Sequence, residues 1–419
     1  MKRHQVLDKQ LSFNQLLKSI KTDQKMAFYK GEDDFMISWG KESEFVLKKE
    51  NSLNSVQDYF DGEKGNYLFG YLNYDLKNRF ESNLKSKNED KLHFPLLYFF
   101  VPQHIIFCKR GELIYFGDSS IPDLTEIITK EADNDKHSNF TLNLNPCTTK
   151  TDYIQAVEQL QNQIQQGFIY EVNYCVNFEG NTDGQIIEGE HLFERLSSKT
   201  EAPFSAFFSH PNQELICASP ERFIRRKKDR LISQPIKGTS SRGTNEQIDD
   251  ELKQALFNDP KERSENVMIT DLVRNDLSKI AQKRSVSVEH LCEVKSFKTV
   301  HQLVSTVGCD LKPEVNILEI IKALFPMGSM TGAPKISAME HSEQYESFKR
   351  GIYSGSVGYI DPNGNMDFNV VIRSIFRNKK TNHLSAAVGG AITIDSVPEK
   401  EYQECLLKLE ALKASLENH

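Results

Sequence analysis

The sequence lacks several features that would assign it to a specialised class. None of its seven cysteines forms a C-x-x-C pair or another metal-ligand spacing, so neither a zinc site nor a disulfide framework is indicated. No run approaches the ~18 apolar residues of a membrane span, and the start has no apolar core of signal-peptide length. The net charge of -7 leaves no basic excess for nucleic acid or an anionic membrane. These absences predict a cytoplasmic protein with reduced thiols.

The 419 residues, 38% of them hydrophobic, are enough to bury a full core. Short β-rich runs separated by polar turns fill the amino-terminal part, and the polar, aperiodic residues 130–150 are the best linker candidate. This pattern predicts a β-rich half, 1–145, and a catalytic region, 150–419. Strands followed by helices in the second part favour an α+β fold with mainly antiparallel sheets. Helices are expected at 151–166, 249–281 with a break at Pro260, 316–324, 334–345 and 398–417, and strands at 352–360, 367–377 and 384–394.

One lysine in a restricted segment is the first candidate for chemistry. In SQPIKGTSSRGT (233–244), Pro235 fixes the backbone before Lys237, and Gly238 frees the backbone after it. We therefore expect Lys237 to lie in a shaped turn. Most lysines are solvated surface groups, so a role for this one has to come from its neighbours.

The last predicted helix carries two carboxylates and a lysine on one face. Glu401, Glu404 and Lys408 are spaced i, i+3 and i+7. Two carboxylates one turn apart can hold a hard divalent cation, and the lysine can meet a substrate carboxylate. A solvated acidic face with an internal ion pair is the competing interpretation.

A second acidic helical segment supplies one further carboxylate. Asp271, Arg274 and Asp276 are expected to form structural ion pairs. Glu265 lies about two turns upstream on the same pattern and can face elsewhere, towards a pocket.

Three segments near the carboxyl end suit an anionic ligand. FPMGSMTGAPK (325–335) is a glycine-rich turn before a predicted helix, and it either binds an anion through backbone N–H groups or forms a tight connection. Gly389 and Gly390 allow a ligand or a packed neighbour to approach a strand closely. Arg373 in the apolar strand FNVVIRSIF needs an anionic partner, and its planar fork fits a carboxylate.

His301 and Glu221 complete the candidates. His301 follows a strand-like run and is either a site residue or a satisfied core histidine. Glu221 follows a proline and is either a placed acid or an exposed turn glutamate. Taken with the lysine, the carboxylates and the arginine, these residues favour a small polyanionic substrate bound through Mg²⁺.

Ordered segments across the second part of the chain resemble the chorismate-utilising enzymes. The segments are ASPERF, PIKGT, ENVMITDLVRND, VHQLVSTV, FPMGSMTGAPK, IYSGSVGYI, VIRS and EYQE, and GYLNYDL (70–76) resembles the family's amino-terminal half. The family includes anthranilate, aminodeoxychorismate, isochorismate and salicylate synthases. The resemblance implies an α+β fold in which large, mainly antiparallel sheets form a sandwich flanked by helices.

The resemblance also implies a substrate and a division of roles. The substrate is chorismate, a dicarboxylate held with Mg²⁺, and the metal-binding residues are Glu265, Glu404 and, next to the metal, Glu401. Arg373 and Tyr353 match residues that hold the enolpyruvyl carboxylate. The full substrate-binding set is Tyr353, Arg373, Gly389, Gly390, Lys408 and Ser329. The catalytic set is Lys237, Glu221 as general acid, His301 and Thr331.

Within the family, Lys237 resembles the aminodeoxychorismate synthase branch. Anthranilate and salicylate synthases usually carry alanine there, whereas PIKGT is characteristic of that branch. The resemblance implies that the lysine amine attacks C2 of chorismate as hydroxide leaves C4, and that ammonia then adds at C4. Desolvation beside other cations would give Lys237 the lowered pKa that a nucleophile requires. Glu171 falls where isochorismate synthases place a water-activating lysine, which disfavours water addition.

The source of ammonia is implied to be a partner. The chain has no G-x-C-x-G nucleophile turn, so a separate glutamine amidotransferase subunit is expected to supply ammonia. The product, 4-amino-4-deoxychorismate, would feed 4-aminobenzoate and folate synthesis. Met327 and Ala391 depart from the glycines usual in the family, and both are expected to narrow the approach to the substrate.

Other hypotheses stay open at the level of sequence. Anthranilate synthase component I, or a subunit serving both pathways, is the alternative within the family. A non-catalytic chorismate-binding partner is the alternative from another class, and the intact set Lys237, Glu265, His301 and Glu404 argues against it. Without the resemblance, a lysine Schiff-base enzyme acting on a keto acid is a third.

Overall fold

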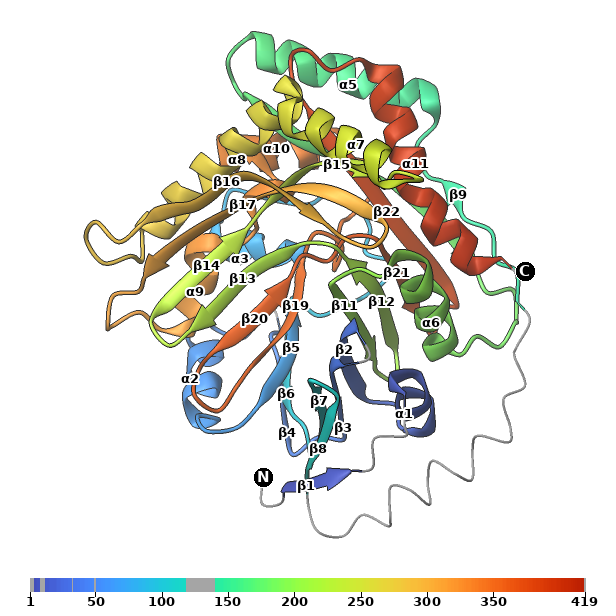
Figure 1. Ribbon diagram of the computed structural model, residues 1–419, viewed down its shortest axis with the longest axis vertical. Helices are drawn as coiled ribbons and strands as arrows, with labels where there is room; N and C mark the ends of the chain where they lie inside the picture. The colour runs from blue at the N-terminus through green and yellow to red at the C-terminus, as the bar shows by residue number, and fades with distance from the viewer. Residues whose placement is uncertain (1–3, 8–11, 32, 49, 118–139, 418–419) are drawn as a thin grey trace.

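Two antiparallel sheets pack face to face in the computed structural model (Figure 1), which describes residues 4–7, 12–31, 33–48, 50–117 and 140–417. In these ranges the first sheet has twelve strands, in the order β1 (His4–Leu7), β8 (Glu112–Phe116), β7 (His104–Lys109), β3 (Asp34–Trp39), β2 (Lys25–Gly31), β11 (Phe204–Ser209), β12 (Gln213–Ser219), β21 (Ser374–Asn378), β22 (His383–Ile392), β10 (Glu171–Asn181) and β18 (Gly332–Ala333), with β9 (Asn145–Pro146) also on β10.

The second sheet has ten strands in the same described ranges. Their order is β15 (Ile236–Ser241), β17 (Val300–Asp310), β14 (Arg230–Gln234), β13 (Arg222–Lys227), β20 (Met366–Asn369), β19 (Ser356–Ile360), β5 (Leu68–Leu72), β6 (Leu97–Val101) and β4 (Ser43–Val46), with β16 (Ser287–Ser296) also on β17. The expected antiparallel α+β sandwich is therefore confirmed.

The helices cover the outer faces and one end of the sandwich (Figure 1). On the twelve-stranded sheet lie α1 (Phe13–Ser19), α5 (Lys150–Gln165), α6 (Gly189–Thr200) and α11 (Pro398–Leu416). Against β15, β16 and β17 lie α7 (Glu246–Asn258) and α8 (Pro260–Ser278). The other α-helices of the described ranges are α2 (Asn54–Gly62), α3 (Lys77–Phe80), α9 (Ile317–Leu324) and α10 (Lys335–Tyr345). No helix in the described ranges is long and apolar enough to cross a membrane.

The twelve-stranded sheet is buried on both faces. Along β12, Leu215 and Cys217 enter the core between the two sheets, whereas Ile216 and Ala218 enter the core beneath the helices. Alternating side chains thus supply two separate cores, which explains why the stretch LICA (215–218) is continuously apolar. All seven cysteines are free thiols, and six of them are buried.

The predicted boundary near residue 150 does not separate two cores. β2 pairs with β11 in one sheet and β5 pairs with β19 in the other, so strands from both sides of the boundary share both sheets. Of the predicted linker, residues 130–139 lie outside the described residues. Phe140, Leu142 and Leu144 follow them and are buried in the helix-side core.

Local signals in the sequence account for the helices that were predicted. The expected break at Pro260 separates α7 from α8, and the Asp259 side chain caps the new helix by accepting the Glu262 N–H at 2.9 Å. α5, α9, α10 and α11 also lie where the sequence predicted helices. The predicted strand 367–377 is instead two strands, β20 and β21, with a bend between them. α1, α2, α3 and α6 were not predicted.

Candidate active site

A cavity of about 560 Å³ opens between β15, β17, β22, α8 and α11. Its wall contains every predicted site residue except His301 and Thr331: Lys237, Glu221, Ser329, Tyr353, Arg373, Gly389, Gly390, Lys408, Glu265, Glu401 and Glu404. These residues come from both sheets and from two helices. The assembled sandwich therefore brings together groups that lie far apart in the sequence.

Lys237 lies in a bulged strand rather than in the predicted turn. The register of β15 against β17 slips between Ile236 and Thr239, and Gly238 has a φ of +84°. A bulge re-aims the side chains that it carries, and the positive φ at Gly238 is why glycine follows the lysine. A Cβ at Gly238 would also stand 3.0 Å from the Glu262 carboxylate.

Carboxylates surround the Lys237 ammonium. Its Nζ donates to Glu171 Oε1 at 2.8 Å and lies 4.0 Å from Glu265 Oε2. Burial alone would lower the pKa of Lys237, but Glu171, Glu265 and Glu221 outweigh burial and raise that pKa above its usual range. The predicted lowering of the pKa is therefore wrong, because the nearest charged groups are anions and not the cations that were expected.

Glu221 is a buried acid on the cavity wall and not an exposed turn residue. Its side chain is buried, and Ser329 Oγ donates to its Oε1 at 2.6 Å. Burial raises the pKa of Glu221 to about 7, although Ser329 and Lys237 favour the charged form. A carboxyl group that holds its proton near neutral pH can act as a general acid.

Three predicted metal-binding glutamates share one wall of the cavity. Glu265 on α8 is buried, and burial raises its pKa to about 7 despite the nearby lysine at 237. The Lys261 ammonium lies 3.1 Å from Glu401 Oε1 and 3.9 Å from Glu265 Oε1. Lys408 Nζ lies 2.6 Å from Glu404 Oε1. Within the described ranges, no three carboxylate, histidine or cysteine side chains converge closely enough to hold a metal ion.

The two adjacent glycines of β22 have different neighbours. A Cβ at Gly390 would lie 3.5 Å from the carboxylate of Glu401 and 3.8 Å from the Lys408 ammonium, so Gly390 faces the cavity. A Cβ at Gly389 would lie 2.5 Å from the Tyr174 carbonyl oxygen on β10. Close strand packing explains Gly389, and the open cavity explains Gly390.

Arg373 lies in the bend between β20 and β21 and not inside a strand. Its φ is +53°, and its Nη1 donates to the Lys408 carbonyl oxygen at 3.3 Å. Burial lowers the pKa of Arg373, and no carboxylate in the described part of the chain forms an ion pair with it. Its guanidinium is consequently open to a carboxylate supplied by a ligand.

His301 and Thr331 do not reach the cavity. His301 is fully buried on β17, with Nδ1 2.8 Å from Ser296 Oγ and Nε2 3.0 Å from Asp249 Oδ1. The Thr331 hydroxyl donates to the carbonyl oxygens of its own loop, Met327 at 3.3 Å and Gly328 at 3.2 Å. Both side chains are occupied within the fold, so their prediction as ring-lining catalytic groups is not supported by this geometry.

Gln302, the next residue on β17, lines the cavity where the sequence predicted His301. Adjacent side chains of a strand point to opposite faces, and Val300 and Gln302 line the cavity. The Gln302 side chain is buried, and its Oε1 has no hydrogen-bond partner among the described residues. A buried amide oxygen without a donor favours a ligand that supplies one.

Two further site residues were missed or left without a role. Lys261 contacts both Glu265 and Glu401. The sequence predicted only that Lys261 lies on an acidic helix, and nothing in that pattern indicated these two contacts. Glu171 holds Lys237 through one carboxylate oxygen, and its other oxygen is buried without a partner in the described residues. Glu171 on β10 and Lys237 on β15 belong to different sheets, so only the packing of the two sheets places this carboxylate beside the lysine.

Met327 and Ala391, the two departures from the family pattern, lie in different parts of the structure. Met327 has a φ of −63°, which any residue can adopt, and its side chain is buried in the core between the sheets. It does not line the cavity, whereas Ala391 does. Of the two residues expected to narrow the approach to the substrate, only Ala391 lies on the cavity wall.

The chain belongs to the chorismate binding enzymes, whose family profile matches residues 12–414. It is 40% identical over 266 residues to a probable chloroplastic aminodeoxychorismate synthase of Oryza sativa subsp. japonica, a match covering 63% of this chain and 29% of the rice protein. It is 31% identical over 368 residues to aminodeoxychorismate synthase component 1 of Bacillus subtilis, covering 83% of this chain and 76% of that protein.

Anthranilate synthases are also among the relatives and the solved structures. Anthranilate synthase component 1 of Aquifex aeolicus is 31% identical over 384 residues, covering 84% of this chain and 74% of that protein. The structure of anthranilate synthase component I from Streptococcus pneumoniae TIGR4 superposes with a TM-score of 0.77 at 23% identity, covering 90% of this chain and 91% of that one. At that identity the likeness establishes the fold.

Gln302 and His301 provide a matched pair of variants. We expect Gln302→Leu to weaken chorismate binding roughly tenfold, because the buried acceptor is lost from the cavity wall. We expect His301→Ala to leave the affinity within about threefold and to lower the free energy of unfolding by about 1–3 kcal/mol, because Ser296 and Asp249 lose their partner. Calorimetric titration with chorismate and urea unfolding measure the two effects. A larger loss of affinity in His301→Ala than in Gln302→Leu would reverse the assignment.

Proposed function

We propose that this chain is component I of an aminodeoxychorismate synthase, which aminates chorismate at C4 with ammonia. The observation that carries the proposal is Lys237, whose amine reaches a cavity that also holds the buried acid Glu221. The relatives named aminodeoxychorismate synthase component 1 in Bacillus subtilis and Salmonella typhimurium support the same branch. The product is 4-amino-4-deoxychorismate, a precursor of 4-aminobenzoate and folate.

The cations of the cavity suit a dicarboxylate. Arg373 has no carboxylate partner among the described residues, and the Lys408 ammonium donates to the Gly389 carbonyl oxygen at 2.8 Å beside Gly390. Arg373 and Tyr353 hold the enolpyruvyl carboxylate, and Lys408 lies near the ring carboxylate. Two cationic groups, one for each carboxylate, would hold the substrate and so orient its ring.

Covalent catalysis divides the amination into two displacements. Glu171 accepts a proton from the Lys237 ammonium, and the free amine forms a bond to C2. The two ring double bonds shift, the C4–O bond breaks, and the hydroxide leaves as water after taking a proton from Glu221. Ammonia then forms a bond to C4, the double bonds shift back, and the C2–N bond to Lys237 breaks. The released lysine amine takes its proton back from Glu171, and the Glu221 carboxylate takes a proton from the new C4 ammonium.

Magnesium is the cofactor of the proposal. Glu265, Glu401 and Glu404 would supply hard oxygen donors of the kind that Mg²⁺ prefers, although the three side chains do not converge on one point by themselves. The Lys261 ammonium contacts Glu265 and Glu401, which indicates that this part of the cavity attracts a cation. When bound, Mg²⁺ neutralises the ring carboxylate and withdraws electron density, which helps the C4 hydroxyl to leave.

A separate glutamine amidotransferase subunit is the ammonia source in this proposal. The bacterial relatives are named as component 1, which implies a second component. The matched region is only 29% of the rice relative, so that protein contains much sequence beyond this region. Ammonium salts can replace the partner in an assay, because the chemistry at C4 needs ammonia alone.

Intact-protein mass spectrometry tests the covalent step. With chorismate and Mg²⁺ but no ammonia, we expect the wild type to gain the mass of chorismate minus one water. Lys237→Ala should show no adduct and should lose roughly 10³-fold or more of the amination rate, because the nucleophile is removed. The exposed Lys283→Ala is the control and should behave as the wild type. A wild type that gives isochorismate or salicylate, with no amination when ammonia is supplied, contradicts the proposal.

Anthranilate synthase component I is the second candidate, and the relative from Aquifex aeolicus favours it. Anthranilate is fluorescent, whereas 4-amino-4-deoxychorismate lacks the aromatic ring. Fluorescence that develops with chorismate, ammonia and Mg²⁺ would therefore select anthranilate synthesis. Chromatography of the same mixture identifies the non-aromatic product that we expect.

Removal of the metal tests the role of the three glutamates. We expect chelation with EDTA to abolish amination and added Mg²⁺ to restore it. Glu401→Gln should raise the Mg²⁺ concentration needed for half-maximal activity about tenfold, since loss of a second-layer ligand partner typically costs 10–100-fold in metal affinity. Glu410→Gln changes an exposed carboxylate on the same helix and is the control. Full activity in excess EDTA would contradict the metal assignment.

The buried acid at 221 predicts a specific pH dependence of stability. Its folded pKa of about 7 exceeds the ordinary value of 4.5, so the folded state binds the proton more tightly than the unfolded state. Between about pH 4.5 and 7, the free energy of unfolding of the wild type should therefore fall as pH rises, relative to Glu221→Gln. The same variant should slow adduct formation by about 10²–10⁴-fold. Urea unfolding across this range checks the sign, with the exposed Glu246→Gln as control.

A further inference from the structure

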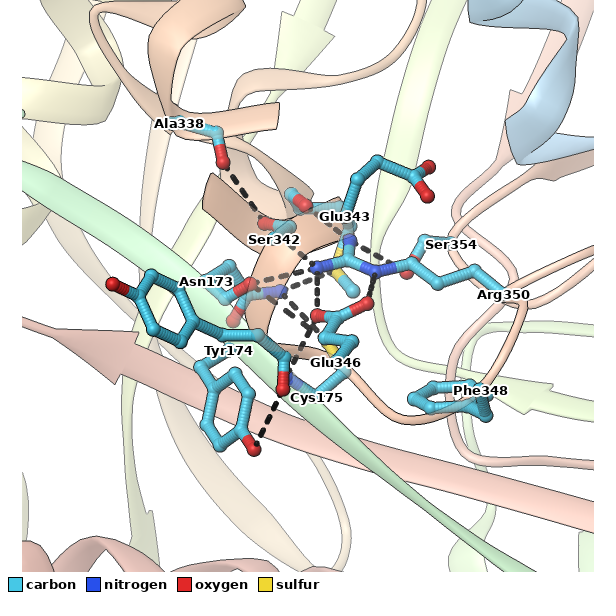
Figure 2. Close-up of polar contacts among 12 residues, drawn as sticks. Asn173, Tyr174, Cys175, Ala338, Ser342, Glu343, Glu346, Phe348, Arg350 and Ser354 are labelled. Carbon is cyan, nitrogen blue, oxygen red and sulfur yellow. Dashed lines mark hydrogen bonds and ion pairs between the residues drawn. The ribbon is translucent and has the colours of Figure 1, made fainter. Parts of the chain in front are cut away.

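A buried arginine–glutamate pair stands behind the cavity wall (Figure 2). Arg350 and Glu346 are both buried, and they are joined by two bonds, Nε to Oε2 at 2.8 Å and Nη2 to Oε1 at 2.6 Å. Glu346 directly follows α10, and Arg350 lies in the segment before β19. Neither side chain lines the cavity.

The remaining donors of Arg350 hold backbone that does line the cavity. Nη1 donates to the Met330 carbonyl oxygen at 2.7 Å. Nη2 donates to the Asn173 carbonyl oxygen, also at 2.7 Å (Figure 2). Met330 and Asn173 are both wall residues. A planar guanidinium presents its donors in fixed directions, so one side chain sets the relative position of two segments.

The pair fills a gap in the edge of β10. β10 pairs with β18 at Glu171 and Val172, and with β9 at Phe178 and Glu179. Between these pairings, the Cys175 N–H donates to Glu346 Oε1 at 3.0 Å, next to the bond that Arg350 makes on the same edge. Side chains therefore satisfy backbone groups that no strand reaches there.

The contacts extend from this pair to groups that act in the cavity. Ser329, the neighbour of Met330, donates to Glu221, and the Tyr353 N–H donates to the Arg350 carbonyl oxygen at 3.0 Å. On β10, Asn173 lies two residues from the carboxylate that holds Lys237. The acid Glu221 and the nucleophile Lys237 are thus hydrogen-bonded to two segments, that of Met330 and β10, which Arg350 joins.

We propose that Arg350, held by Glu346, is the positioning residue of this cavity. It fixes the segment of Met330 against β10 and thereby sets the separation of Glu221 from Lys237. An apolar pair of similar volume can replace a buried ion pair with little loss of stability, but it would not hold two carbonyl groups. A misplacement of about 1 Å can cost about 10²-fold in rate, so this separation matters for catalysis. The inference rests on the proposed function.

Arg350→Lys separates positioning from stability. Lysine keeps the charge beside Glu346, but it lacks the planar fork that reaches both carbonyls. We expect kcat for ammonia-dependent amination to fall about 10²-fold, with the KM for chorismate within about threefold because Arg373 and Lys408 are unchanged. The rate is expressed per folded molecule, well below the melting temperature. A purely structural role would lower the melting temperature and leave this kcat unchanged.

Lys25→Met is the matched control, because it breaks a buried ion pair with Glu190 that lies outside the cavity. It should reduce the free energy of unfolding and leave kcat and KM as in the wild type. If Arg350→Lys does not fold, Glu346→Gln decides, since it keeps the side-chain size and the acceptor for the Cys175 N–H. We expect its kcat to fall at least about tenfold, because the Gln NH2 group cannot accept the Arg350 Nε–H and that charged bond is lost.

The outcomes separate this inference from the function on which it rests. A wild type that forms no amination product refutes the proposed function. An active wild type, together with a folded Arg350→Lys or Glu346→Gln whose kcat stays within about threefold of the wild type, refutes the positioning role alone. A loss of kcat in Lys25→Met equal to that in Arg350→Lys also refutes it, because general destabilisation would then explain both.

Discussion

The pairing of β10 with β22 is the constraint on which the rest of the site depends. The ladder runs without a break from Val172 with Ile392 to Asn181 with His383, and it joins segments about two hundred positions apart in the chain. β10 brings Glu171 to Lys237, and β22 brings Gly390 to the face below α11. Backbone hydrogen bonds fix this register, because a slip by one residue would turn every side chain to the opposite face.

The cavity concentrates charge that the fold has to compensate. Lys237 is held by Glu171, Lys261 by Glu401, and Lys408 by Glu404, so most of its cations already have an anionic partner. Arg373 is the exception among the wall residues described, and it faces the same space. Buried charges are costly unless paired, so an anionic ligand that completes this set is favoured over an apolar one. The same carboxylates raise the pKa of Lys237 and so favour its protonated form.

Capping residues and hydrophobic spacing predicted a helix or strand correctly where residues close in the sequence determine it. The Asp259 cap and Pro260 marked the start of α8, and Glu401 and Glu404 fell on one helix as their spacing required. The predictions failed where a neighbour elsewhere decided the outcome. The lysine at 237 lies in a bulge because β15 has to follow β17, and His301 turns away from the cavity because the frame of β17 puts Gln302 on that face. A motif does not reveal which of two neighbouring residues faces the cavity, because neighbouring side chains of a strand point to opposite faces of the sheet.

The sequence by itself determined the chemical types at the site and the α+β class, since residue identity, capping and hydrophobic pattern are properties of short segments. It also carried the ordered motifs that place the chain among chorismate binding enzymes. Only the tertiary structure decided which carboxylate holds Lys237, that Glu221 is buried with a raised pKa, and that Arg350 lies behind the wall. These are properties of contacts between residues far apart in the chain, and burial and pairing across such distances come into being only when both sheets have assembled.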